Sequence, residues 1–155
     1  MEFVIFLSKL DKEILNLLIK ANYVVEENKI ECLLNKEIMG LHSFIENKII
    51  ICTENAKRKT NYRNEKQHPN KDNFKTKLAI RKALRHEATH AIQKCNNNKT
   101  VGDIKDLESK LHPRKRRSLE FSTSNFSGTY AKEVEAYILE DKPKKVKNMI
   151  KKYCL

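Results

Sequence analysis

The sequence predicts a small, helix-rich α+β domain with a short sheet beside one long helix. Three observations support this fold class. Apolar residues recur at helical spacing in several segments, only three glycines and three prolines interrupt the 155 residues, and Ile49-Ile50-Ile51 is typical of a buried strand. A chain of this length corresponds to about one domain, so we expect one domain over residues 1–155.

The N-terminal half is predicted to combine one helix with short extended segments. Residues 1–22 have the pattern of a helix whose first residues are extended. Residues 23–34 are ambiguous, although two β-branched valines favour a strand at their start. Residues 37–47 fit a helix or a mixed connection, and residues 48–53 fit a short buried strand. Charges and amides dominate residues 54–75, which we expect to form a loop.

A long amphipathic helix is predicted over Thr76–Cys95. Neither Gly nor Pro interrupts this range, and Asp72 and Asn73 just upstream are suitable N-cap residues. Its apolar residues recur at helical spacing: Leu78, Ala79, Ala83, Leu84, Ala88, Ala91 and Ile92.

The C-terminal half is less regular. Residues 101–111 have a weak helical pattern, and residues 112–127 are predicted to form an exposed basic loop followed by a Ser/Phe stretch. Tyr130–Leu139 is the most apolar downstream segment and predicts a short helix, with Ser127, Gly128 and Thr129 before it as start signals.

The long helix contains the motif His86-Glu87-Ala88-Thr89-His90, which reads HExxH. Residues four apart lie on one face of a helix, so both imidazoles can approach one metal ion. Glu87 follows His86 directly, so its side chain is rotated by one helical position from that of His86. From this position its carboxylate can act on a water at the metal. This is the pattern of a zinc hydrolase, with two histidine ligands and a glutamate general base.

A catalytic zinc site usually takes three protein ligands and keeps one position for water. The helix predicted at 130–139 offers Glu133 and Glu135 on different sides, and periodicity alone does not choose between them. His112 would complete an all-histidine site, but it precedes Pro113 and a basic run, which is typical of an exposed loop. The further acidic candidates downstream are Asp103, Asp106, Glu108, Glu120, Glu140 and Asp141.

Residues 86–90 and 133–136, Glu-Val-Glu-Ala, resemble the gluzincin branch of the zinc metallopeptidases, including its minimal members. This resemblance implies a zincin-like domain with a Zn²⁺ cofactor and Glu133 as the third ligand. The run from His90 to Cys95 is also similar to Atp23-like peptidases and related bacterial and phage proteins. The step from His90 to Glu133 is longer than in that compact pattern, which implies an insertion over 96–129.

These observations predict a zinc metallopeptidase that hydrolyses a peptide or protein substrate. Zinc would be held by His86, His90 and Glu133, and Glu87 would take a proton from the attacking water. The strand predicted at 48–53 would be an edge strand that binds extended peptide, or else a plain core strand.

A net charge of +12 raises an alternative, a basic nucleic-acid-associated binding module or a DNA-associated protease. The basic runs are Pro113–Arg117 and the six lysines within 142–152. Lysine and asparagine are frequent throughout the chain, however, and aromatic residues do not interleave with the basic runs. Catalysis is therefore the preferred interpretation, because a purely structural metal site needs no glutamate at position 87.

The four cysteines form no CxxC pair, so their spacing does not indicate a structural zinc knuckle. Without a recognisable secretory signal, we expect reduced thiols and a cytoplasmic location. Cys95 and Cys154 would meet only if the C-terminal segment folds back on the long helix. No apolar run approaches the roughly 20 residues of a membrane span.

Overall fold

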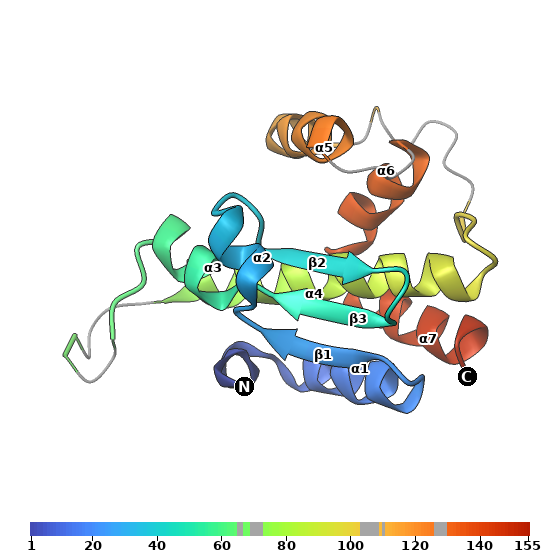
Figure 1. Ribbon diagram of the computed structural model, residues 1–155, viewed down its shortest axis with the longest axis horizontal. Helices are drawn as coiled ribbons and strands as arrows, with labels where there is room; N and C mark the ends of the chain where they lie inside the picture. Colours follow the sequence, from blue (N-terminus) through green and yellow to red (C-terminus); the bar gives the residue numbers. More distant parts are fainter. Residues whose placement is uncertain (65–66, 69–72, 103–108, 110, 126–129) are drawn as a thin grey trace.

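The predicted long helix is the centre of the structure, and a small sheet lies in front of it in the view of Figure 1. This computed structural model describes residues 1–64, 67–68, 73–102, 109, 111–125 and 130–155. The long helix, α4, spans Phe74–Cys95, and α6 spans Tyr130–Leu139 as predicted. The fold is a mostly helical α+β domain with a three-stranded mixed sheet, which confirms the predicted fold class.

The sheet has the strand order β1-β3-β2. β1 (Val24–Glu27) pairs parallel with β3 (Lys48–Ile51), and β2 (Gly40–Ser43) pairs antiparallel with β3 on the other side. The strand predicted from the three isoleucines is therefore the central strand, and the interpretation of it as an edge strand was wrong. The outermost strand beside the site is β2, which the sequence did not identify because four half-buried residues show no alternation.

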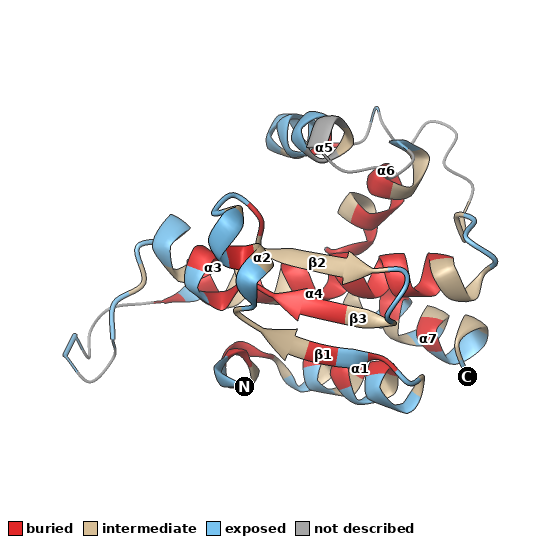
Figure 2. Ribbon diagram, in the orientation of Figure 1, coloured by how far each residue is buried: buried red, intermediate tan, exposed pale blue. Residues whose placement is uncertain are grey.

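The core lies mainly between the sheet and the helices behind it, where the buried residues concentrate (Figure 2). Ile49 and Ile51 face α4, whereas Ile50 faces the opposite side and joins a smaller cluster. α1 (Lys9–Lys20) and α7 (Pro143–Tyr153) pack against each other and against α4. The largest contributors from these helices are Ile14, Leu18, Ile80, Leu84, Val146 and Ile150.

Three short elements at the N-terminal side differ from the predictions. The range 1–22 divides into a 3-10 helix, η1 (Glu2–Phe6), and α1. α2 (Ile30–Leu34) follows β1. α3 (Thr53–Lys59) occupies the start of the predicted 54–75 loop. Tertiary contacts favour this helix: Thr53 Oγ1 donates a hydrogen bond to Glu27 (2.5 Å), and the backbone N–H of Glu54 donates to Asn28 (3.1 Å).

A helix, α5 (Pro113–Asn125), replaces the predicted exposed basic loop. Pro113 is favourable at the first helical position, and His112 Nδ1 accepts a hydrogen bond from the backbone N–H of Arg114 (3.3 Å). Leu119 is buried against α6 together with Leu111. One buried leucine in a basic stretch is too weak a periodic signal to predict this helix.

Several predicted features lie outside the described residues. They are most of the weak helical pattern at 101–111, the N-cap candidate Asp72, and the segment 127–129 before α6. The other N-cap candidate, Asn73, makes no side-chain cap to α4. Its side chain instead exchanges hydrogen bonds with the backbone of Arg63.

All four cysteines are paired, so the prediction of reduced thiols was wrong. Cys32–Cys52 joins α2 to the end of β3, and Cys95–Cys154 joins the end of α4 to the end of α7. Disulfides are rare in cytosolic proteins, so the two bonds argue against the predicted cytoplasmic location. Within the described part of the chain, no helix is long and apolar enough to cross a membrane.

Candidate metal centre

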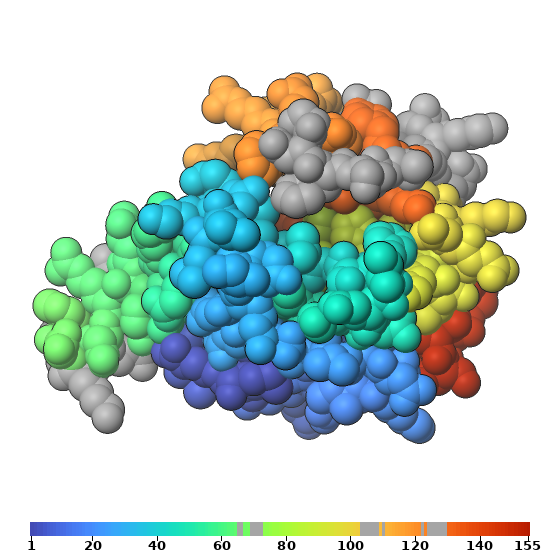
Figure 3. Space-filling model, viewed as in Figure 1, coloured from blue at the N-terminus to red at the C-terminus, as the bar shows by residue number. Residues whose placement is uncertain are grey.

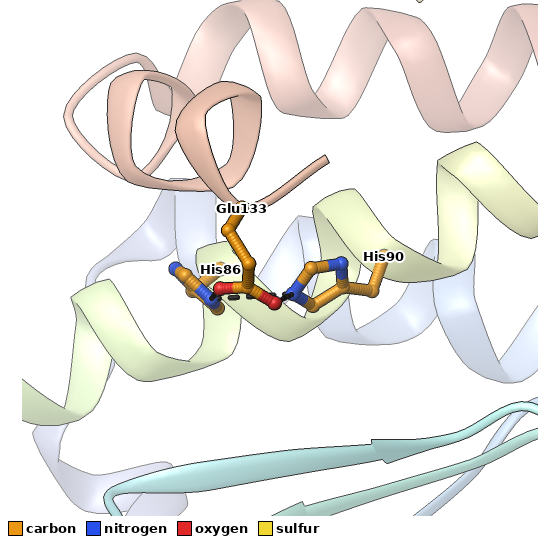
Figure 4. Close-up of side chains that lie close together, drawn as sticks. All are labelled: His86, His90 and Glu133. Carbon is orange, nitrogen blue, oxygen red and sulfur yellow. Dashed lines mark hydrogen bonds and ion pairs between the residues drawn. The ribbon is translucent and has the colours of Figure 1, made fainter. Parts of the chain in front are cut away.

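Two turns of α4 and the first turn of α6 bring His86, His90 and Glu133 together, as Figure 4 shows. The Nε2 atoms of the two histidines lie 3.2 Å apart. Glu133 places Oε2 3.3 Å from Nε2 of His86 and Oε1 3.2 Å from Nε2 of His90. The three residues are buried and their ligand atoms lie within 4.8 Å of one another, so this cluster could hold a metal ion.

The spacing of the cluster suits a tetrahedral transition ion. Zinc lies about 2.0–2.1 Å from its nitrogen ligands, so two ligand atoms of a tetrahedral site are roughly 3.3 Å apart. The 3.2 Å between the two Nε2 atoms matches this value, and each of these nitrogens has one oxygen of Glu133 at 3.2 to 3.3 Å. Oε2 of Glu133 is also buried without a hydrogen-bond partner, which an ion at this position would supply. Two imidazoles and one carboxylate accept zinc and several other transition ions.

The packing of α6 on α4 explains why Glu133 reaches the histidines. Ala136 is fully buried, and a residue of this size lets two helices approach closely. Burial favours the neutral acid form of Glu133, but contacts with the two histidines outweigh burial and hold the pKa of Glu133 below its usual range. The carboxylate is therefore ready to accept a cation.

A second set of hydrogen bonds holds Nδ1 of His90, the ring nitrogen that faces away from the cluster. Its Nδ1 lies 2.9 Å from Oε1 of Gln93, whose amide nitrogen donates to Glu135 (2.9 Å). Glu135 in turn accepts hydrogen bonds from the backbone N–H groups of Val101 (2.9 Å) and Gly102 (2.7 Å). Glu135, the alternative third ligand, therefore lies behind His90 and outside the cluster.

His86 has an acidic neighbour on its other ring nitrogen. Glu140 lies 3.7 Å from Nδ1 of His86, and Lys115 holds Glu140 with an ion pair of 3.0 Å. Burial opposes a positive charge on His86, but its contacts with Glu133 and Glu140 raise the pKa of this imidazole well above its usual value. Glu140 was one of the acidic candidates in the sequence, and it lies on the side of His86 away from the cluster.

Glu87 is buried between α4 and the edge strand β2. A Cβ atom on Gly40 would lie 2.8 Å from both Cγ and Oε1 of Glu87, so only glycine at this position leaves room for the carboxylate. Burial raises the pKa of Glu87, although the nearby histidines lower it in part. A raised pKa makes this carboxylate a stronger base than an exposed glutamate.

The remaining sequence candidates lie elsewhere or are not described. His112 directly precedes α5, and Asp141 forms ion pairs with Lys82 and Lys115. Glu120 is exposed on α5. Three candidates, Asp103, Asp106 and Glu108, fall outside the described residues.

His42 lies on β2 near the cluster and has no functional signal in the sequence. Its ring is 6.4 Å from the ring of His90, between centroids, and neither ring nitrogen has a hydrogen-bond partner. Burial lowers the pKa of His42 to about 3, with a smaller effect from His90 and Lys94. No periodic signal marks this residue, because β2 itself was not predicted.

Comparisons with curated proteins and with solved structures found no match. The resemblance to gluzincins and Atp23-like peptidases therefore stays a prediction. A family model described as a domain of unknown function, DUF8637, matches residues 3–155. Because this match covers almost the entire chain, the protein belongs to the DUF8637 family.

Proposed function

We propose that this protein is a zinc-dependent peptidase. The observation that supports this most strongly is the buried cluster of His86, His90 and Glu133 with the carboxylate of Glu87 beside it. A site that only stores or structurally binds a metal needs no buried base next to its ligands. The combination is that of a metallohydrolase, with a three-ligand metal site and a separate general base.

In the proposed reaction, His86, His90 and Glu133 hold the ion, and Glu87 moves the proton. Bound zinc would supply Lewis-acid polarisation of the substrate carbonyl and make water a stronger acid. The Glu87 carboxylate takes a proton from the attacking water and later delivers it to the leaving amine. Its raised pKa suits both roles, because the group must first accept and then release this proton.

The position of β2 favours an extended peptide as the substrate. β2 is one of the two edge strands of the described sheet, and its residue Gly40 lies directly against Glu87. A peptide that adds to this edge by main-chain hydrogen bonds would pass beside the cluster. Figure 3 shows the surface hollowed between β2 and α6, with α4 at the bottom of the hollow.

Removal of the metal is the direct test of this proposal. The purified protein, incubated with unfolded casein and with a mixed peptide library, should hydrolyse both, and mass spectrometry should identify new peptide ends. A chelator should abolish the hydrolysis, and stoichiometric zinc should restore it, because the proposed reaction needs the ion. Hydrolysis that survives complete removal of metal would refute a metallopeptidase, as would a zinc-loaded protein that cleaves neither substrate.

Gly40→Ala should lower peptide hydrolysis by about 100-fold while the metal content stays unchanged. The new Cβ would lie 2.8 Å from Oε1 of Glu87 and would displace the carboxylate, and a misplacement of about 1 Å can cost that factor in rate. Ser43→Ala, at the other end of β2, is the matched control, because it removes a hydroxyl that accepts a hydrogen bond from the backbone N–H of Glu46 (3.4 Å). Equal rates for Gly40→Ala and Ser43→Ala would show that Glu87 has no precise catalytic position.

The basic surface supports a second candidate, a module or protease that associates with nucleic acid. Arg114, Arg116 and Arg117 are exposed on α5, whose first turn contains no acidic residue. Salt-sensitive binding to single-stranded DNA that persists in Glu87→Gln would favour a binding module. Peptide hydrolysis that DNA stimulates would instead favour a DNA-associated protease.

A further inference from the structure

Gln93 has a defined amide orientation because of its hydrogen-bond partners. Its side chain is fully buried, and its Nε2 atom lies 3.0 Å from the backbone oxygen of Lys132 and 2.9 Å from Oε2 of Glu135. A carbonyl and a carboxylate are both acceptors, so the atom between them must be the NH2 group. The amide oxygen of Gln93 therefore faces Nδ1 of His90, at 2.9 Å.

This orientation assigns the proton on His90. The amide oxygen of Gln93 only accepts hydrogen bonds, so Nδ1 of His90 must be the donor. A neutral imidazole with its proton on Nδ1 keeps a lone pair on Nε2, the atom that faces Glu133 and His86. In the 3.2 Å contact between the two Nε2 atoms, the donor is then His86.

Glu135 is the last acceptor in this series of hydrogen bonds, and it also binds backbone N–H groups beyond the end of α4. Its carboxylate is almost fully buried and accepts from the N–H groups of Val101 and Gly102 as well as from Gln93. The hydrogen bonds thus run in one direction, from His90 through Gln93 to Glu135. The backbone donors at 101 and 102 fix the acceptor at the far end.

We propose that Gln93 and Glu135 are positioning residues of the metal site, which hold His90 in the tautomer that a metal requires. This inference rests on the proposed metal site and goes beyond it, because neither residue touches the ion. Hydrogen bonding of the second ring nitrogen fixes the tautomer and ring orientation of a histidine ligand and makes the ligand more basic. Loss of such a partner typically costs about 10–100-fold in metal affinity.

Glu135→Gln is the sharpest test, because it preserves the shape of the side chain and removes the carboxylate acceptor at the end of these hydrogen bonds. Its new amide oxygen would accept from Val101 and Gly102, so its NH2 group would face Nε2 of Gln93. Two donors then meet where a donor met a carboxylate, and a turned Gln93 amide would place its oxygen against the backbone oxygen of Lys132, so both orientations of Gln93 contain one repulsive contact. Gln93 therefore holds the proton on Nδ1 of His90 less firmly, and we expect zinc affinity to fall by about 10–100-fold.

The matched control is Asn96→Ala. Asn96 donates a hydrogen bond to the backbone oxygen of Thr100 at 3.0 Å. Loss of this side chain weakens the turn before Val101 and leaves the hydrogen bonds between His90, Gln93 and Glu135 in place. Zinc affinity, measured by competition with a chromophoric chelator, should stay within about threefold of the wild type in this variant. An equal loss of affinity in Asn96→Ala and Glu135→Gln would overturn the proposal, because it would show that only the turn matters.

Nitrogen NMR of the metal-free protein gives a readout that depends on neither zinc nor activity. The His90 ring should carry a proton on Nδ1 in the wild type, and Glu135→Gln should lower the fraction of rings that are protonated at this nitrogen. A wild-type His90 whose Nδ1 carries no proton overturns the inference, whatever the activity of the protein. A wild type that binds zinc with the expected tautomer but hydrolyses no peptide leaves this inference intact and refutes the peptidase proposal.

Discussion

Glu87→Gln is expected to lower kcat for peptide hydrolysis by about 10²–10⁴-fold while the metal content stays that of the wild type. Glutamine has the shape of glutamate but cannot take a proton from water. Glu87 is not part of the His86–His90–Glu133 cluster, so the substitution leaves all three metal-ligand candidates in place. The measurement is the steady-state rate on a peptide substrate, with the metal content of the same samples.

The same variant also controls for contaminating proteases, because it is purified in the same way as the wild type. Glu87→Asp should retain the metal and show a rate between those of the wild type and Glu87→Gln, since its carboxylate is one methylene further away. Wild-type kcat in Glu87→Gln would show that another group is the base. Loss of metal in Glu87→Gln would show that Glu87 is itself a ligand.

Asp11→Ala is expected to lower the free energy of unfolding by about 3–5 kcal/mol. Asp11 is fully buried in the first turn of α1 and receives two hydrogen bonds from Arg85 of α4, at 2.6 and 3.0 Å. Removing the carboxylate leaves the Arg85 guanidinium buried without its anionic partner, which is the costly way to break such a pair. Urea unfolding of the two proteins gives the difference directly.

The effect should also reach the metal centre, because Arg85 precedes His86 and donates a hydrogen bond to the backbone oxygen of Glu140 (3.0 Å). Glu13→Ala is the matched control on the same helix. Glu13 forms a more exposed ion pair with Lys147, so its loss should cost much less than the loss of Asp11. Similar losses for Asp11→Ala and Glu13→Ala would contradict the structural role of the buried pair.

The elements that carry the histidines and Glu133 were predictable because their signals are local. α4 and α6 follow from apolar spacing and from the absence of Gly and Pro, and the motif follows from two histidines four residues apart. The choice between Glu133 and Glu135 was not local. It depends on the rotation of α6 against α4, which directs Glu133 to the histidines and Glu135 to Gln93. That Glu133 is a metal ligand remains a prediction.

The rest of the site depends on contacts between distant segments. β2 is four residues long, and its importance comes from Gly40, whose missing side chain makes room for Glu87 more than forty residues later. α5 packs against α6 through Leu119. The basic residues around Leu119 show no apolar periodicity from which this contact could be predicted. Cysteine spacing likewise predicted neither disulfide, although the C-terminal helix does fold back on α4 and places Cys154 beside Cys95.

We expect His86, His90 and Glu133 to bind one catalytic metal ion, and the metal content of the purified protein shows whether they do. Wild type, His86→Ala, Glu133→Ala and His112→Ala should be purified with zinc supplied, checked for folding by circular dichroism, and analysed by elemental mass spectrometry. We predict about one zinc per chain in the wild type and in His112→Ala, and none in the other two variants. A folded wild type without metal, or full metal content in both His86→Ala and Glu133→Ala, would contradict the claim.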